Sequence, residues 1–228
     1  MPLFWDIETA GLHDGAAITC AVTYDSETDH AVAYHSGGGK PMSASIAQRL
    51  ADAVVAAPVS VTYNGASFDF ARLYAATGDE RLKPAMWRHH DVMLQFMADN
   101  GYRSKMDAFA KASLGEANSK TNTGDWAARA WFAGNHDEVI DYCESDTRVL
   151  CALYNRAIAQ GSLERVTAKG KRTVWVVNAD PSDASPVWVS VADAQARWQA
   201  NPPDVAWMTD PPTLTDQTSW AGAATQGP

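Results

Sequence analysis

The stretch FWDIETAGL at positions 4–12 constrains the fold of this chain most, because it places two carboxylates inside an apolar run. Acidic residues form strands poorly and are rarely buried without a compensating partner. In a strand of this sequence, the two-residue period puts Asp6 and Glu8 on the face that also carries Phe4. Trp5 then lies on the opposite face. A core strand with two acids on one face predicts a site that uses their charge. The simpler alternative is the solvent-facing side of an edge strand.

The hydrophobic pattern predicts an α/β domain over residues 1–163. Strands are predicted at residues 3–8, 16–24, 30–36 and 59–63, and helices at residues 43–57, 67–77, 91–100, 105–115, 125–134 and 136–161. The first three strands predict an antiparallel meander. The fourth strand, the turn at Asn64-Gly65 and the helix that follows are typical of the α/β part of a sheet. Residues 116–124 are predicted to form a polar loop.

The sequence changes character after this domain, and we expect a small C-terminal element over residues 164–228. The segments KRTVWVV (171–177) and SPVWVSV (185–191) predict a β-hairpin. Residues 190–193 are spaced as a capping box for a helix that begins there. From residue 201 the chain is rich in Pro, Thr and Asp, and its end is expected to be disordered.

Composition and charge exclude some classes of protein. The formal net charge of −9 argues against a protein that coats nucleic acid through a broad basic face. A groove for nucleic acid would therefore be local, with candidate phosphate contacts at Lys105, Lys111, Lys120, Arg129, Lys169, Lys171 and Arg172. No run of about 18 apolar residues is present, so no membrane span is expected. The N-terminus shows no signal-like segment, and the expected location is cytoplasmic.

Two other groups of potential metal ligands are better explained by packing and capping. Cys20, Cys143 and Cys151 lack CxxC spacing, which argues against a zinc site or a disulfide framework and favours small core residues. In His89-His90-Asp91, adjacent histidines point to different sides of any regular element. The aspartate of this tripeptide is well placed as a helix N-cap.

Two further segments carry acids that a hydrophobic period does not explain. In TYNGASFDF, Asp69 follows Phe68 in the first turn of a predicted helix. In DYCESDTRVL, Asp146 lies one turn after Tyr142 on the same helix face. Each of these residues has a simpler interpretation when taken singly. Asp69 could be a first-turn acid favoured by the helix dipole, and Phe68 could be a core residue. Tyr142 and Asp146 could be a polar pair on a helix surface.

Hydrolysis of a phosphodiester explains why acids from three segments would converge. The reaction needs a nucleophile next to a polyanion and stabilisation of charge on the attacking and leaving oxygens. Two divalent metals about 4 Å apart supply both. Because Mg²⁺ and Mn²⁺ prefer oxygen ligands, about three to four carboxylates on rigid elements are needed to hold them. A tyrosine one helical turn before the last acid would bring a hydroxyl close to the attacking water.

In order and spacing, the three segments resemble the exonuclease motifs of the DEDD superfamily, and the Y-x-x-x-D spacing resembles its DEDDy branch. The resemblance covers roughly residues 3–155. It is greatest to the proofreading domain of family B DNA polymerases and to stand-alone exonucleases related to it. It implies a ribonuclease H-like fold with a mixed five-stranded sheet flanked by helices, here followed by a small hairpin and helix. It also implies two bound divalent metals and removal of nucleotides from 3′ ends.

The same resemblance assigns roles to single residues. Asp6 would bridge both metals, Glu8 and Asp146 would bind the metal on the nucleophile side, and Asp69 would bind the leaving-group metal directly or through water. Tyr142 would position or help to deprotonate the attacking water. Substrate contacts are implied at Thr9, at Leu12 through packing on the terminal base, at Asn64, and at Phe68 as a stacking surface.

This resemblance, together with the converging acids, predicts a 3′–5′ exonuclease that depends on two Mg²⁺ or Mn²⁺ ions, prefers single-stranded DNA and releases nucleoside 5′-monophosphates. An RNase D-like exoribonuclease is the first alternative, because recognition of the 2′-OH depends on the detail of the groove. A non-catalytic nucleic-acid binding module would not need a complete metal set, and a ribonuclease H-like endonuclease would not need Tyr142 at this spacing. Expected partners are 3′ DNA ends, with RNA as the alternative, and proteins of DNA replication or repair. The Trp-rich extension resembles those of some phage-encoded exonucleases.

Overall fold

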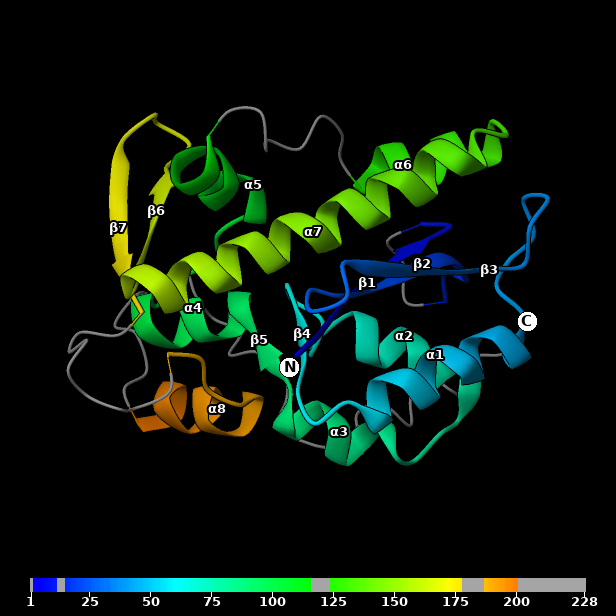
Figure 1. The fold of residues 1–228 in the computed structure, drawn as a ribbon, viewed down its shortest axis with the longest axis horizontal. Coiled ribbons are helices and arrows are strands. Elements are labelled where there is room, and N and C mark those ends of the chain that lie inside the picture. The colour runs from blue at the N-terminus through cyan, green and yellow to red at the C-terminus, as the bar shows by residue number, and fades with distance from the viewer. Residues whose placement is uncertain (1, 12–14, 116–123, 178–186, 201–228) are drawn as a thin grey trace.

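The computed structural model describes residues 2–11, 15–115, 124–177 and 187–200. Its centre is a sheet of five strands in the order β3-β2-β1-β4-β5 (Figure 1). The strands are β1 (Leu3–Thr9), β2 (Ile18–Asp25), β3 (His30–His35), β4 (Ser60–Thr62) and β5 (His90–Asp91). The first three form the predicted antiparallel meander. Because β4 runs parallel to β1 and β5 runs parallel to β4, the sheet is mixed, as predicted.

Two elements of the fold, the strand β5 and a short helix, were not predicted from the hydrophobic pattern. β5 contains two residues, and a segment so short has no period to detect. The other element is α3 (Leu82–Arg88), whose Pro84 suggests a helix breaker. Pro84 lies in the first turn of α3, where a backbone N–H has no intrahelical partner and proline is tolerated.

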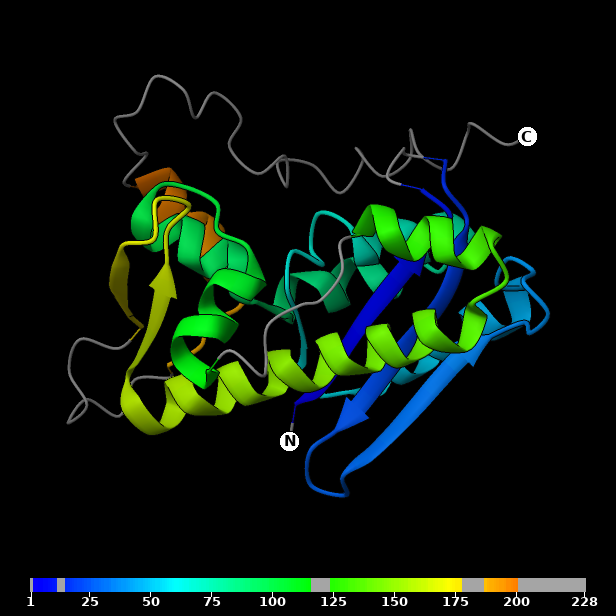
Figure 2. The same ribbon diagram turned by 90° about the horizontal axis from the view of Figure 1, so that it is seen from above.

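Helices cover both faces of the sheet, as predicted (Figures 1 and 2). One face carries α1 (Ala44–Ala56), α2 (Asp69–Thr77) and α3, and the other carries α6 (Gly124–Phe132) and α7 (His136–Gln160). β1 is buried on both sides in consequence. Trp5 and Ile7 join the apolar cluster under α1 to α3, whereas Phe4 joins the cluster that contains Leu150 of α7. The alternative of an exposed edge strand is therefore wrong, because β1 lies in the middle of the sheet.

The pairing of β1 with β2 becomes irregular at the end of β1 that carries the acids. Glu8 lies opposite Cys20, but the next residue, Thr9, lies opposite Ile18, so one residue of β2 is skipped. Such bulges bend a strand and turn its side chains, and they are common next to active sites.

A second packed region lies at the C-terminal end of α7 (Figure 1). Its elements are α4 (Val92–Asn100), α5 (Met106–Phe109), the π-helical turn η1 (Ala110–Leu114), β6 (Ser162–Val166) and β7 (Arg172–Val176). The last helix, α8 (Val191–Ala200), packs on α4 and α3. The single helix predicted over residues 105–115 is thus divided. The Ser113 hydroxyl in η1 donates to the carbonyl oxygen of Glu164 and accepts its backbone N–H, each at 2.8 Å. This contact with β6 is a tertiary feature that a local pattern does not contain.

The hairpin predicted from residues 171–177 and 185–191 is wrong in its second strand. β7 pairs with β6, through a short turn that contains Gly170 at a φ of 78°. Residues 187–190 form no strand, and the Trp188 ring instead stacks on Tyr154 with 4.9 Å between ring centroids. Because β6 directly precedes β7, their pairing closes a shorter loop than the predicted pairing of β7 with residues 185–191. A shorter loop costs less conformational entropy.

One half of the predicted capping box is present at the start of α8, since the Ser190 hydroxyl accepts the backbone N–H of Asp193 at 3.1 Å. The same hydroxyl donates to the Asp193 carboxylate at 2.7 Å. Residues 116–123 of the predicted polar loop and the predicted tail from residue 201 lie outside the described residues. Among the helices that the structure describes, none has both the length and the apolar character of a membrane span.

Candidate active site

Three carboxylates from distant parts of the sequence converge between β1 and α7. Figures 1 and 2 show that α7 packs across β1 at this place. Asp6 and Glu8 come from β1, and Asp146 comes from the middle of α7. Each offers one carboxylate oxygen, and the three oxygens lie within 4.8 Å of one another. The period of β1 explains the direction of its two acids, since they share the face of Phe4, which packs with α7 residues.

Asp69 joins this group from the opposite side, at the start of α2. The backbone N–H of Ile7 in β1 donates to Asp69 Oδ1 at 3.0 Å, which fixes the start of α2 against β1. The Asp69 side chain is 2% exposed. Burial, and then the negative charges of Asp6 and Asp91, hold the pKa of Asp69 well above its usual value of 3.8. The fourth acid therefore lies within electrostatic reach of the first.

A constrained turn before α2 sets the position of Asp69. Asn64 has a φ of 74°, and a Cβ atom at Gly65 would lie 2.0 Å from the Thr62 hydroxyl oxygen. The turn needs a glycine there for this close approach. The Asp91 carboxylate accepts the backbone N–H groups of Asn64 and Ala66, at 2.9 and 3.0 Å. These contacts hold the turn between β4 and α2 in one conformation.

The same carboxylate caps α4, since Asp91 Oδ1 accepts the backbone N–H of Leu94 at 3.1 Å, which confirms the predicted N-cap. The neighbouring His89 ring lies between the hydroxyls of Ser60 and Thr62, at 2.9 and 2.7 Å. Both of its nitrogens are occupied, and burial lowers its pKa well below 6.5. This histidine is therefore a satisfied core residue rather than a metal ligand.

The four acids line a cavity of about 290 Å³. Its walls contain every candidate site residue within the described part of the chain: Asp6, Glu8, Thr9, Asn64, Phe68, Asp69, Tyr142 and Asp146. Leu12 lies outside the described residues. Ile7 and Tyr63 also line the cavity, although the sequence did not predict them as site residues. Tyr63 directly precedes Asn64, but at the end of the apolar run predicted as a strand over residues 59–63 it resembles a core residue.

Tyr142 and Asp146 lie one turn apart on α7 and both face the cavity. The Tyr142 ring meets Trp126 of α6 edge to face, with 5.5 Å between ring centroids. The adjacent Cys143 is buried, and its thiol donates to the backbone oxygen of Asp6 at 3.5 Å. α7 is thereby packed directly against the strand that carries the first two acids. The prediction that the cysteines are small core residues agrees with the burial of all three.

The two predicted substrate contacts next to the acids have different surroundings. Phe68 is partly exposed, and the guanidinium of Arg72 lies 5.0 Å from its ring centroid. Thr9 is buried, and its hydroxyl donates to the backbone oxygen of Gly11 at 2.6 Å. Phe68 thus keeps aromatic surface at the cavity, whereas the Thr9 side chain is engaged by its own turn.

The donor set fits hard divalent cations. Carboxylate oxygens are the ligands that Mg²⁺ and Mn²⁺ prefer, and three of them converge here, with Asp69 on the same cavity. Asp6, Glu8 and Asp146 are the residues that would hold the metals, together with Asp69. A bound metal would also offset the mutual repulsion of these acids.

Comparison with known proteins agrees with this geometry. A sequence model of the RNase H superfamily matches residues 3–158, which include all four acids. The chain belongs to the RNase H superfamily. No curated protein matches this RNase H superfamily chain at a significant level.

Among solved structures, this RNase H superfamily chain is similar to a family B DNA polymerase from the hyperthermophilic archaeon Pyrobaculum calidifontis. The TM-score is 0.53 at 15% sequence identity, and the match covers 68% of this chain and 24% of the polymerase chain. At this identity the likeness concerns the fold alone. Superfamily membership together with the acidic cluster suggests a metal-dependent nuclease that hydrolyses nucleic acid.

Proposed function

We propose that this protein is a 3′–5′ exonuclease of the DEDDy branch that acts on single-stranded DNA and releases nucleoside 5′-monophosphates. The observation that carries the proposal is the position of Tyr142, one helical turn before Asp146 and facing the same cavity as the acids. A metal site alone would need only the carboxylates. A phenol beside them supplies a group that can hold a water molecule.

The proposed reaction breaks the bond between the phosphorus of the last phosphodiester and the 3′ oxygen of the preceding nucleotide. A water oxygen forms the new bond to phosphorus, and the departing 3′ oxygen takes up a proton. When bound, two divalent cations would stabilise the charge on the attacking and leaving oxygens. The carboxylates of Asp6, Glu8, Asp69 and Asp146 would hold these cations, and the Tyr142 hydroxyl would orient the water.

The shape of the site supports action at a chain end. A cavity of about 290 Å³ is small, and its walls carry both the acids and the partly exposed Phe68 ring. We propose that this ring stacks on a base of the substrate, as aromatic side chains do in single-strand binding sites. Asn64, in its constrained turn, would place a polar group beside that base or its sugar.

The test is a gel assay on 5′-labelled linear single-stranded DNA with Mg²⁺ or Mn²⁺, with RNA of the same sequence and circular single-stranded DNA alongside. We expect a ladder that shortens from the 3′ end on linear DNA, no cleavage of the circle, and no reaction with EDTA. The control variant is Asp146→Asn, which keeps the shape of the side chain and removes its charge. Faster degradation of RNA would replace DNA by RNA as the substrate. Cleavage of the circle would contradict an exonuclease, and binding without any cleavage would leave a binding module.

A further inference from the structure

A second cavity, of about 490 Å³, lies between α5–η1 and the β6–β7 hairpin. We call it the basic groove; one wall runs from Tyr102 to Lys111 and the other from Arg165 to Ala168. In both views the hairpin lies beside α5, at the C-terminal end of α7 (Figures 1 and 2). The proposed function assigns no role to this groove or to the hairpin.

The groove is positive in a chain whose net charge is −9. Its walls carry Arg103, Lys105, Lys111 and Arg165 against one carboxylate, that of Asp107. Lys111 is partly neutralised, because its ammonium lies 3.1 Å from the Asp107 carboxylate. Arg103 and Lys105 are exposed, and within the described ranges no carboxylate forms an ion pair with either. Local positive charge of this kind is the electrostatic footprint of phosphate binding.

The position of Arg165 is fixed by its neighbours. Its guanidinium carbon lies 4.7 Å from the ring centroid of Tyr102 and 5.3 Å from that of Phe96. Its Nε donates to the Thr173 hydroxyl across the hairpin at 3.0 Å. An arginine stacked on aromatic rings loses little further side-chain freedom when it binds a phosphate.

One side chain connects the groove with the candidate active site. Tyr63 lines the cavity of the four acids, and its hydroxyl donates to the backbone oxygen of Ser104 at 2.6 Å. Ser104 lines the basic groove, between Arg103 and Lys105. Tyr63 therefore links the two cavities: it lines the cavity of the four acids, and its hydroxyl contacts a residue that lines the basic groove.

We infer that the basic groove binds backbone phosphates of the substrate strand on the 5′ side of the nucleotide that is removed. The inference rests on the proposed function, which places the 3′ end in the cavity of the acids. A strand that leaves that cavity past Tyr63 would enter the groove beside Ser104, between the wall that carries Arg103 and Lys105 and the wall that carries Arg165 of the hairpin. The C-terminal hairpin thereby becomes part of the substrate path, and phosphate contacts of this kind position a strand without reading its sequence.

The test compares two double variants that remove the same charge. Arg103→Gln/Lys105→Gln changes the groove, and Lys40→Gln/Arg49→Gln changes two exposed cations on and just before α1, far from the hairpin in both views (Figures 1 and 2). Binding of a labelled single strand of about 16 nucleotides is measured by fluorescence anisotropy with Ca²⁺ at several salt concentrations. Hydrolysis of a dinucleotide, too short to reach the groove, is measured with Mn²⁺.

We expect the groove variant to bind the long strand about tenfold more weakly and to lower the salt slope of log K by about 1.4, since each single-strand phosphate contact contributes about 0.7. The α1 variant should bind like the wild type, and all three proteins should hydrolyse the dinucleotide equally. Equal binding by the two double variants would overturn the inference while leaving the exonuclease intact. If no substrate is hydrolysed but the groove variant alone binds weakly, the exonuclease fails and the groove stands as a phosphate site.

Discussion

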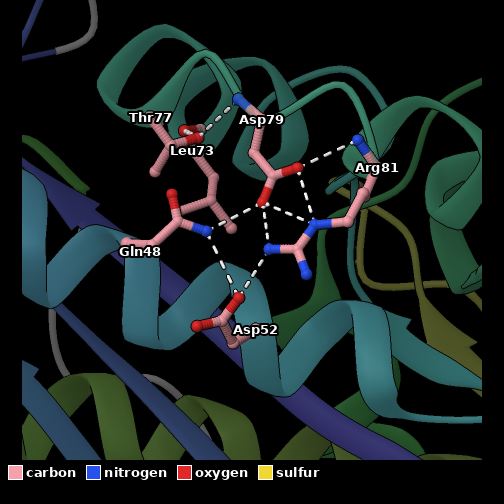
Figure 3. A network of polar contacts seen from close by, with 6 residues as sticks. All are labelled: Gln48, Asp52, Leu73, Thr77, Asp79 and Arg81. Atoms are coloured by element: carbon pink, nitrogen blue, oxygen red, sulfur yellow. Dashed lines mark hydrogen bonds and ion pairs between the residues drawn. The ribbon is translucent and has the colours of Figure 1, made fainter.

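α2 carries a carboxylate at each end, and the two have opposite surroundings. Asp69 at its start is 2% exposed, faces the other acids of the cavity, and has a raised pKa. Asp79, just after its end, lies in a network with Arg81, Gln48 and Asp52 (Figure 3). Hydrogen bonds from Arg81, which approaches Asp79 Oδ2 to 2.6 Å, hold the pKa of Asp79 well below 3.8.

The difference shows what each carboxylate contributes. The network around Asp79 supplies donors and a cation for its charge, joins α1 to the α2–α3 turn, and stabilises the folded chain. The environment of Asp69 disfavours its charge in the absence of a cation, so this acid opposes folding at neutral pH. An acid kept at such a cost is expected at a site that binds something positive.

The largest effect is expected on kcat, which should fall when the acid at the start of α2 is changed but not when the acid just after its end is changed. Asp69→Asn should reduce kcat by about 10²–10³-fold, because it removes a charge that holds the metals while keeping the shape of the side chain. Asp79→Asn should leave kcat unchanged, since Asp79 lies in the network that joins α1 to the α2–α3 turn and does not line the cavity. Initial rates on linear single-stranded DNA at saturating Mn²⁺ measure both. Equal rates for the two variants would contradict the comparison.

A smaller loss of kcat is expected when the Tyr142 hydroxyl, which lies in the cavity but is not a carboxylate, is removed. Tyr142→Phe keeps the ring against Trp126 and removes the hydroxyl. We expect a loss of about 10² in kcat, the usual contribution of a positioned proton-transfer group, with little change in thermal stability. Single-turnover hydrolysis and a melting curve measure the two quantities. An unchanged rate would show that the water is held by other groups.

The raised pKa of Asp69 predicts an effect on stability. Without metal, the folded chain binds a proton at Asp69 more readily than the unfolded chain, so this group makes the folded state less stable as pH rises above 3.8. Asp69→Asn should therefore raise the melting temperature of the metal-free protein at pH 7, and the difference should vanish near pH 4. Excess Mn²⁺ should stabilise the wild type more than the variant. A lower melting temperature for the metal-free variant at pH 7 would contradict the destabilising effect assigned to the Asp69 charge.

The smallest effect is expected at the other end of α2. The lowered pKa of Asp79 means that its contribution is complete above pH 3.8 and is lost as pH falls below that value. Asp79→Asn should reduce the free energy of unfolding at pH 7 by less than about 1 kcal/mol, because Arg81 is 56% exposed and solvent screens the pair. Urea denaturation at low and high salt measures this loss, which should shrink as salt increases. A loss that grows with salt would show that the contribution is not electrostatic.

Much of the architecture was predictable because it follows from short-range rules. The two-residue period of β1 placed Asp6 and Glu8 on the face of Phe4, and the capping positions of Asp91 and Ser190 followed from helix-end chemistry. β5 and the partner of β7 were not predictable in this way. A two-residue strand exists only because β4 lies beside it, and β7 could have paired with either neighbour until packing selected β6.

The sequence by itself determined the acids and their local directions, since the periods of strands and helices decide which residues share a face. Only the tertiary structure decided that these faces meet: α7 packs across β1 through Cys143, and the Asp69 carboxylate is fixed by the Ile7 N–H. The basic groove and the contact of Tyr63 with Ser104 also appear only in three dimensions. Such proximities arise from the burial of apolar surface between distant segments, and no local pattern encodes the partner that each surface selects.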